Sequence, residues 1–195
     1  LTVARNASVH LQVLAGPQPD TEETLEGEAA HLVAMWAAQG RMLEVNSKFK
    51  HKGRDWVVDL EMFNGARRYA KALNAPHNTL RLEDPVRISR IHPTECWGTP
   101  DAWRYFPEGL EWSAGMPVIR VGDYKYGHRF VEVFENFQLI AYVVGVMERL
   151  ELNDMGVMVE LILVQPRSYH REGPVRYWRV PGVDLRALVN IAAGA

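Results

Sequence analysis

The most constraining feature of this sequence is an almost wholly apolar helix that lies between two apolar strands. The helix is predicted over residues 136–150, and its apolar run 139–147 is far shorter than the roughly 20 residues needed to cross a bilayer. The helix must therefore be buried against protein. Residues 117–126 before it and 155–164 after it are rich in β-branched residues, which indicates two buried strands. This segment therefore predicts a strand, a buried helix and a second buried strand, in that order along the chain.

The rest of the chain adds helices and strands around that unit. A first helix is expected between Asp20, which has capping-box spacing with Glu23, and Gly40, which is a natural stop. A second helix is expected over about 56–73. Further strands are expected within 80–91, 98–106 and 177–180, the last as an edge strand, and a final helix over 185–193 with Asp184 as its cap. This order predicts an α/β protein with a central mixed β-sheet flanked by α-helices, and 195 residues fit a single domain over 1–195.

Composition excludes several classes of protein. With 47% hydrophobic and 24% charged residues, the chain can bury a core and is not a disordered or fibrous protein. The single cysteine, Cys96, excludes an internal disulfide and a four-cysteine metal site, and it fits a reducing cytoplasm. The net charge of −2 gives no overall attraction to nucleic acid or to a membrane, so a nucleic-acid partner requires a local basic patch. The first residues do not have the pattern of a signal peptide, and no membrane association is expected.

An acidic and a basic residue stand two apart where the strand before the long helix ends. Asp123 and Lys125 follow the apolar residues Val118, Ile119 and Val121, and residues two apart in a strand share a face. Their carboxylate and ammonium groups should therefore project side by side. A surface ion pair on an edge strand would give the same spacing. The apolar residues before the pair favour a functional site.

Three other patterns contain polar residues in settings where chemistry is plausible. Asp101 follows Gly98-Thr-Pro near a predicted strand, although a simple turn explains it equally well. Gln138 and Tyr142 share one face of the apolar helix, where polar residues at the water boundary are the alternative. His31 lies in the first helix among small residues, which would allow a sheet to pack close, and a structural histidine is the alternative.

Taken in order, these patterns read Gly-x-x-x-His, Gly-x-x-Asp, Asp-x-Lys and Gln-x-x-x-Tyr. This order resembles the RecB-like branch of the PD-(D/E)XK nuclease superfamily, whose motif would stand here as Pro100-Asp101 and Asp123-Tyr124-Lys125. The stretches EGEAAH, RISRIHPTECWGTPDAW, DYKYG, ENFQLIAYVVGVME and LILVQPR resemble a phage and prophage exonuclease-type group, from about residue 8 to the final helix. The resemblance implies a restriction-endonuclease-like core.

The resemblance also implies a function, a cofactor and partners. The expected activity is metal-dependent hydrolysis of DNA phosphodiester bonds, most plausibly by a phage exonuclease of recombination or replication in the cytoplasm of an infected or lysogenic bacterial host. The sequence has no helicase motif and no phosphate-binding loop. Processive action would therefore need a homo-oligomer, or a recombination or single-strand-binding partner.

Phosphodiester cleavage needs a metal that holds the phosphate and activates water, and Mg²⁺ prefers oxygen ligands. By resemblance, Mg²⁺ or Mn²⁺ would be bound by two carboxylates, a backbone carbonyl and a helix-borne imidazole, from Asp101, Asp123, Tyr124 and His31. Lys125 would join the two acidic residues as the third catalytic group, orienting water or stabilising charge on the phosphate. Gln138 and Tyr142 would position Lys125 or the DNA backbone. Glu28 is a further candidate carboxylate on the first helix.

Basic residues outside this set are candidates for holding DNA. Residues 48–54 are expected to form a loop with four cations around Phe49, namely Lys48, Lys50, Lys52 and Arg54. A solvated surface loop is the alternative. Arg167, after Gln165-Pro166, is another candidate for a phosphate contact.

The sequence leaves three functions open. An exonuclease and a structure-selective endonuclease would share these motifs. A nuclease fold retained as a DNA- or protein-binding module without cleavage is the third, although such a module has no need of the Asp–Asp–Lys set.

Overall fold

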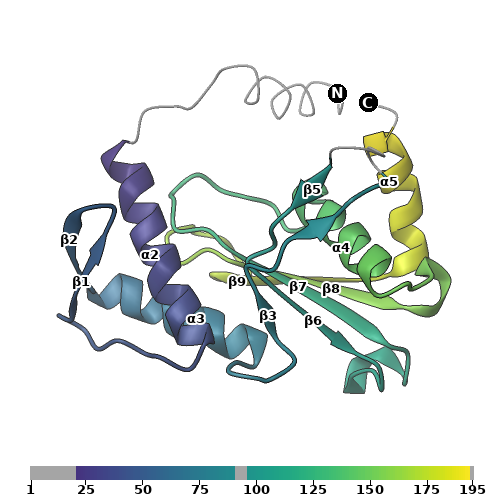
Figure 1. The fold of residues 1–195 in the computed structure, drawn as a ribbon, viewed down its shortest axis with the longest axis horizontal. Coiled ribbons are helices and arrows are strands. Elements are labelled where there is room, and N and C mark those ends of the chain that lie inside the picture. Colours follow the sequence, from purple (N-terminus) through teal and green to yellow (C-terminus); the bar gives the residue numbers. More distant parts are fainter. Residues whose placement is uncertain (1–20, 91–95, 194–195) are drawn as a thin grey trace.

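The computed structural model describes residues 21–90 and 96–193, and its centre is a mixed five-stranded sheet of order β3-β6-β7-β8-β9 (Figure 1). Its strands are β3 (Arg81–Leu82), β6 (Ala102–Phe106), β7 (Val118–Tyr124), β8 (Met158–Val164) and β9 (Val175–Pro181). Only β7 and β8 pair in parallel, and helix α4 (Phe137–Arg149) connects them. The predicted α/β class, with a central mixed sheet flanked by helices, is confirmed.

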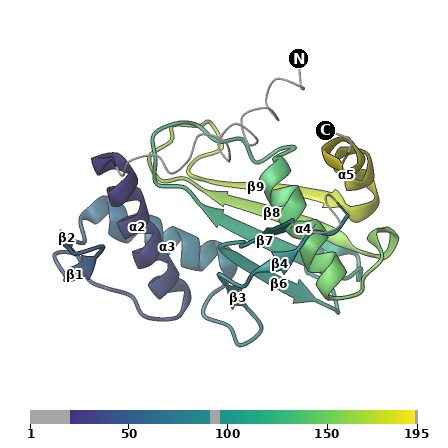
Figure 2. The same cartoon turned by 45° about the horizontal axis from the view of Figure 1, so that its top comes forward.

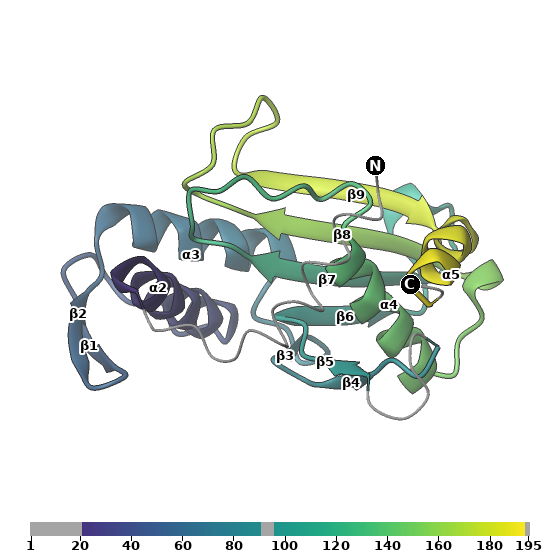
Figure 3. The same cartoon turned by 90° about the horizontal axis from the view of Figure 1, so that it is seen from above.

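The sheet has a separate apolar core on each face. Helices α4 and α5 (Arg186–Ala193) cover one face, whereas α3 (Leu60–Leu73) packs on the other, with α2 (Glu22–Ala38) against it (Figures 1 and 3). Ile119 and Val121 of β7 belong to the core under α4, while Tyr124 belongs to the core under α3. Because successive side chains of a strand point to opposite faces of the sheet, one strand contributes residues to both cores. Polar residues at the strand ends lie between the two helical layers.

The helices begin at side-chain caps. Thr21 caps α2 by accepting a hydrogen bond from the Thr24 amide, while Asp20, the expected cap, lies outside the described residues. Asp59 caps α3 by accepting from the Met62 amide at 2.7 Å, so this helix begins later than predicted. Asn136, the first residue of the predicted helix, caps α4 by accepting from the Leu139 amide.

The segment expected as a basic loop is a β-hairpin, which corrects that prediction. Strands β1 (Lys48–His51) and β2 (Arg54–Val57) pair antiparallel, and the turn places Lys52 and Gly53 in the left-handed region with φ of 48° and 74°. Two consecutive residues with positive φ are typical of a two-residue hairpin turn, and glycine favours it. One face of the hairpin packs on α2, where Phe49 meets the Trp36 ring at 5.5 Å.

The stretch between α3 and β6 is more broken than predicted. It contains β3 and a separate antiparallel pair, β4 (Val86–Arg87) with β5 (Trp97–Gly98), which lies against α4. Ile91, the last residue of the predicted range 80–91, is outside the described residues. Glu148 of α4 fixes this region by accepting three hydrogen bonds, from the amide and hydroxyl of Ser89 and the amide of Arg90.

Two further predictions concern the edge strand of the sheet and the start of the final helix. β9 lies at the edge of the sheet, as predicted (Figure 2). Asp184 does not cap the final helix, because it lies inside a 3₁₀ turn, Gly182–Leu185, that precedes α5. Two further 3₁₀ turns are Glu111–Ser113 and Asp154–Gly156. None of the described helices combines the length and apolar character that crossing a membrane requires.

Candidate active site

The candidate site lies where the start of β6 and the end of β7 meet. Asp101 directly precedes β6, and the antiparallel register pairs Ala102 with Gly122, so Asp101 lies beside the last residues of β7. Its carboxylate Oδ2 accepts a hydrogen bond from the backbone amide of Tyr124 at 2.8 Å. Two strand segments that are distant in sequence are thus joined through a side chain of the predicted site.

Asp123 and Lys125 form the close pair that their spacing predicted. The Lys125 Nζ donates to Asp123 Oδ1 at 2.9 Å, and Asp123 is only 2% exposed. Burial, and then the charge of Asp101, raise the pKa of Asp123 to about 6, even though Lys125 acts in the opposite direction. The pKa of Lys125 is raised, because the attraction of Asp123 outweighs the effect of burial. The buried carboxylates repel each other, and a cation between them would relieve that repulsion.

His31 brings α2 into the same site. Its Nε2 lies 3.4 Å from Asp101 Oδ2, and this nitrogen is buried without a hydrogen-bond partner in the described part of the chain. Burial alone would lower the pKa of His31, but the nearby Asp101 carboxylate, followed by Glu83 and Asp123, raises it overall. The imidazole therefore faces a negatively charged site, where its Nε2 could be a ligand for a cation.

Gln138 and Tyr142 form the wall of the site on the α4 side. Gln138 Nε2 donates to the Tyr142 hydroxyl at 2.8 Å, as their spacing on one helix face predicted. Burial raises the pKa of Tyr142, and the charges of Asp123 and Asp101 add to this effect, so its hydroxyl lies within their electric field. Gly98 allows this packing, because a Cβ there would lie 2.6 Å from a ring carbon of Tyr142.

Two residues near the carboxylates were not predicted. The Tyr69 hydroxyl on α3 is buried without a hydrogen-bond partner among the described residues, and burial followed by the charges of Asp101 and Asp123 raises its pKa. Glu83 adopts a left-handed backbone with φ of 47° and donates its amide to the Asp101 carbonyl at 3.1 Å. Tyr69 was expected only as an inward-facing residue of its helix, and no sequence pattern indicated Glu83.

Two predicted site residues are occupied elsewhere. Glu28 faces the hairpin, where its carboxylate pairs with Lys52 at 2.6 Å and with His51 at 3.5 Å, so it is not part of the site. Arg167 donates through both terminal nitrogens to Glu26 at 2.7 Å and through Nε to Glu61 at 2.9 Å. It joins α2 to α3, and the prediction that it contacts phosphate is not supported. Among the small residues around His31, Gly27 is not needed for close packing, because a Cβ added there would meet no atom within 4 Å.

The basic hairpin is partly neutralised by carboxylates. Lys52 pairs with Glu28, Arg54 pairs with Glu22, and Lys50 lies 3.9 Å from Asp55. Lys48 and Lys50 are the two exposed lysines of β1, on one side of the strand. These two lysines are therefore better placed to meet a phosphate backbone than Lys52 and Arg54.

This arrangement predicts the effect of substituting the two exposed lysines. Lys48→Ala combined with Lys50→Ala should weaken duplex binding and flatten its salt dependence by up to about 0.9 for each lost phosphate contact. Binding across a salt series in Ca²⁺ measures this slope. The matched control is Arg41→Ala, which removes a different cation near the hairpin. The guanidinium of Arg41 stacks on the Trp36 ring. An unchanged slope in the double variant would show that the hairpin is only a solvated surface.

The donor set suits a hard or borderline divalent cation, although no ready-made metal cluster is present. Among residues 21–90 and 96–193, no three His, Cys, Asp or Glu side chains form a group that could hold a metal ion. The structure explains this, because Asp123 is paired with Lys125 while Asp101 bonds to the Tyr124 amide. The unpartnered Nε2 of His31 and the repulsion between the two carboxylates both fit a cation at this position.

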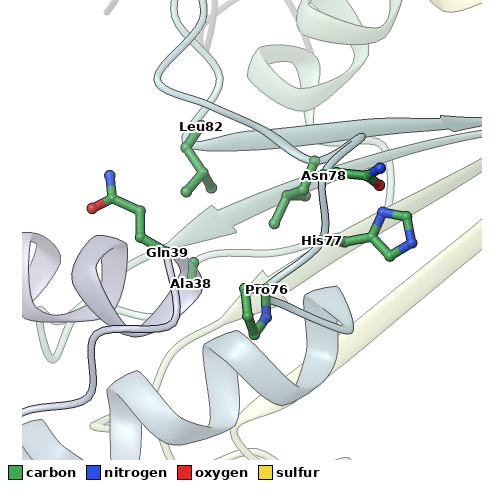
Figure 4. Close-up of a pocket in the computed structure, with 7 residues that line it drawn as sticks. Ala38, Gln39, Pro76, His77, Asn78 and Leu82 are labelled. Atoms are coloured by element: carbon green, nitrogen blue, oxygen red, sulfur yellow. The ribbon is translucent and has the colours of Figure 1, made fainter.

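The main hollows of the surface lie away from these residues. A hollow of about 340 Å³ lies between the end of α2 and the loop before β3, with Gln39, His77 and Leu82 in its lining (Figure 4). A second, of about 600 Å³, lies between α4 and α5 and includes Arg90 and Arg186. Neither includes Asp101 or Asp123.

The fold and this site define a class of protein: an α/β domain with two carboxylates, a lysine and a histidine at one end of its central sheet. Residues 6–190 match the family described as a protein of unknown function (DUF2800), and the chain belongs to this family. No curated protein matches the chain.

Proposed function

We propose that this protein is a metal-dependent DNA nuclease with a restriction-endonuclease-like core of the RecB-like PD-(D/E)XK type. The observation that carries the proposal is the convergence of four side chains from three elements: the start of β6, the end of β7, and α2. Asp101 and the Asp123–Lys125 pair lie on neighbouring strands, and α2 brings the His31 Nε2 to 3.4 Å from Asp101. A purely structural ion pair between Asp123 and Lys125 would need neither the second carboxylate nor the imidazole that faces it.

The residues of the site would divide the work between metal binding and charge stabilisation. Asp101, Asp123, His31 and the Tyr124 carbonyl would hold Mg²⁺ or Mn²⁺. A bound metal of this kind supplies a Lewis acid for the phosphate and a water of lowered pKa. Lys125, held by Asp123, would stabilise the negative charge that develops on the phosphate. Gln138 and Tyr142 would orient the phosphate from the α4 side.

An exonuclease of phage recombination or replication is the favoured form of this activity, on the resemblance described above. The test compares end-labelled linear DNA with covalently closed circles in Mg²⁺ and in Mn²⁺. We expect the linear DNA to be degraded from its ends while the circles persist. Cutting of intact circles, or of a junction or flap at an internal position, would instead indicate a structure-selective endonuclease.

One observation favours the second candidate, a nuclease fold that binds DNA or protein without cleavage. The carboxylates already have partners in this structure, Asp123 with Lys125 and Asp101 with the Tyr124 amide. A site that never receives a metal would keep these contacts. Metal binding separates the two candidates directly.

We expect Mn²⁺ to stabilise the wild-type protein, because the cation relieves repulsion between two carboxylates that are close together in the folded state only. A melting temperature several degrees higher in Mn²⁺ than in EDTA is the expected result, as RT ln(1 + [L]/Kd) reaches about 2.7 kcal/mol at 100 Kd. Asp101→Asn should remove the shift, while Asp84→Asn, at a carboxylate paired with Arg149, should keep it. The absence of any shift in the wild type would favour the binding module.

A further inference from the structure

Three arginines and one glutamate form a row across the sheet. The register places Arg104 of β6 opposite Arg120 of β7, and Arg120 opposite Glu160 of β8. Glu160 in turn lies opposite Arg179 of β9. Since neighbouring strands are about 4.8 Å apart, the row extends over about 14 Å.

The row lies on the face away from α4. Ile119 and Val121 pack into the core under α4, so Arg120 between them projects to the opposite face. On that face α3 covers only the end of the sheet where β7 finishes (Figure 1). No α-helix of the described chain covers the row, although Trp112 of the 3₁₀ turn Glu111–Ser113 stacks on Arg179 at 4.7 Å and the Arg120 side chain is 12% exposed.

The row contains more positive than negative charge. Glu160 is fully buried and pairs with two arginines, Arg120 on one side and Arg179 on the other, where Nε–Oε1 is 2.8 Å. One carboxylate therefore serves two guanidinium groups. With Arg104, the row carries three positive charges and one negative charge, which leaves a net charge of +2.

Arg104 is the uncompensated member of the row. Its Nη2 lies 3.0 Å from the His77 imidazole, and its guanidinium lies 4.3 Å from the centre of the Phe106 ring. Its Nε and Nη1 are buried and have no hydrogen-bond partner among the residues that the structure describes. Burial, and then the charge of Arg120, lower its pKa. A half-buried cation beside another cation costs stability, and such costs are concentrated at functional sites.

We propose that Arg104 and Arg120 bind a phosphate group on this face of the sheet. Two adjacent guanidinium groups match a tetrahedral dianion, because each presents paired N–H donors in a fixed fork. The net charge of the row also matches the −1.5 to −2 that a phosphate monoester carries at pH 7. Arg104 is half-buried and its Nη2 contacts His77, so its side chain would have to turn the unbonded Nε and Nη1 groups toward the ligand.

This phosphate site is separate from the candidate active site. Asp101 lies three residues before Arg104, and Asp123 lies three residues after Arg120, which corresponds to about 10 Å along a strand. An odd offset also places them on opposite faces. The site therefore does not depend on the proposed nuclease activity, and its ligand would be the phosphate of a free nucleotide or of a nucleic-acid strand.

The test measures melting temperature in EDTA, where no cleavage occurs, at matched ionic strength in chloride. Inorganic phosphate, thymidine monophosphate and a short oligothymidylate are added in separate arms. We expect the wild-type protein to melt about 3 °C or more higher with at least one of these ligands near saturation. A response to the monophosphate identifies a nucleotide as the source, and a response that requires the oligomer identifies a strand.

Arg104→Met and Arg149→Met form a matched pair of variants. Each removes an arginine that packs on an aromatic ring, but Arg149 is paired with Asp84 at 2.8 Å and Arg104 has no carboxylate partner in the described chain. Without ligand, Arg104→Met should melt no lower than the wild type, whereas Arg149→Met should melt lower. With ligand, Arg104→Met should lose the shift and Arg149→Met should keep it.

Arg104→Lys provides a second variant if the methionine variant fails to fold. It keeps the charge but loses the fork, and it should show a reduced shift. An equal shift in wild type and Arg104 variants would overturn the proposal, as would no shift with any phosphate ligand. An equal shift with oligoglutamate would also overturn it, because the site would then select charge alone.

Discussion

Asp123→Ala should abolish DNA cleavage, with a loss of at least about 10³-fold in single-turnover rate in either Mg²⁺ or Mn²⁺. The carboxylate is 2% exposed and lies between Asp101 and Lys125, so no neighbouring group or solvent can replace it. The loss should be one of chemistry and not of folding, because removal of Asp123 also removes its repulsion with Asp101. Cleavage of end-labelled linear DNA, with circular dichroism of the same samples, measures both.

Asp55→Ala is the matched control for this substitution. Asp55 is also a strand carboxylate beside a lysine, but its side chain is 78% exposed and lies on the hairpin. The Asp55→Ala protein should cleave DNA at the wild-type rate. A folded Asp123→Ala protein that still cleaves would show that the catalytic centre lies elsewhere.

Lys125→Ala should reduce the cleavage rate by about 10²–10³-fold while changing DNA affinity much less. The ammonium is directed at Asp123 from a distance of 2.9 Å, where it can act on charge that develops during the reaction. Remote phosphate contacts contribute to binding in the ground state, whereas this contact would form with the reacting group. Single-turnover cleavage in Mg²⁺ and binding in Ca²⁺ separate these two quantities.

Lys125→Arg provides a check on the role of the charge, and Lys71→Ala, at an exposed lysine of α3, provides the unrelated control. The arginine variant should recover part of the rate, because it keeps the positive charge but not its position. If Lys125→Ala weakens binding as strongly as it slows cleavage, then Lys125 is a DNA-binding residue and not a catalytic one.

The elements that the sequence predicted well are those with a strong periodic pattern. Helix α4 lies within its predicted range 136–150, and β7 and β8 lie within theirs, because buried elements have long apolar or β-branched runs. The hairpin was missed because its strands alternate charged and half-buried residues, which resembles a solvated loop. Its Lys52-Gly53 turn was the available signal.

The site was predictable where local spacing determines geometry. Asp123 with Lys125 and Gln138 with Tyr142 are each close in sequence, and both pairs are in contact. Glu28 pairs with Lys52 and His51 of the hairpin, which the sequence did not indicate, because helix periodicity does not show which neighbouring element faces a residue. The positions of Tyr69 and Glu83 near the carboxylates depend on tertiary packing that no short pattern encodes.

Helix α2 contributes His31 but shares its main interface with α3, and no strand of the sheet contacts it as extensively. The bidentate pair between Arg167 and Glu26 adds a second attachment. Local opening of α2 would therefore require less free energy than global unfolding, and it would separate His31 from Asp101 while the sheet stays intact. The packing that brings His31 of α2 to Asp101 therefore has an opening equilibrium separate from global unfolding. Amide hydrogen exchange in α2 would measure how often this opening occurs in the native protein.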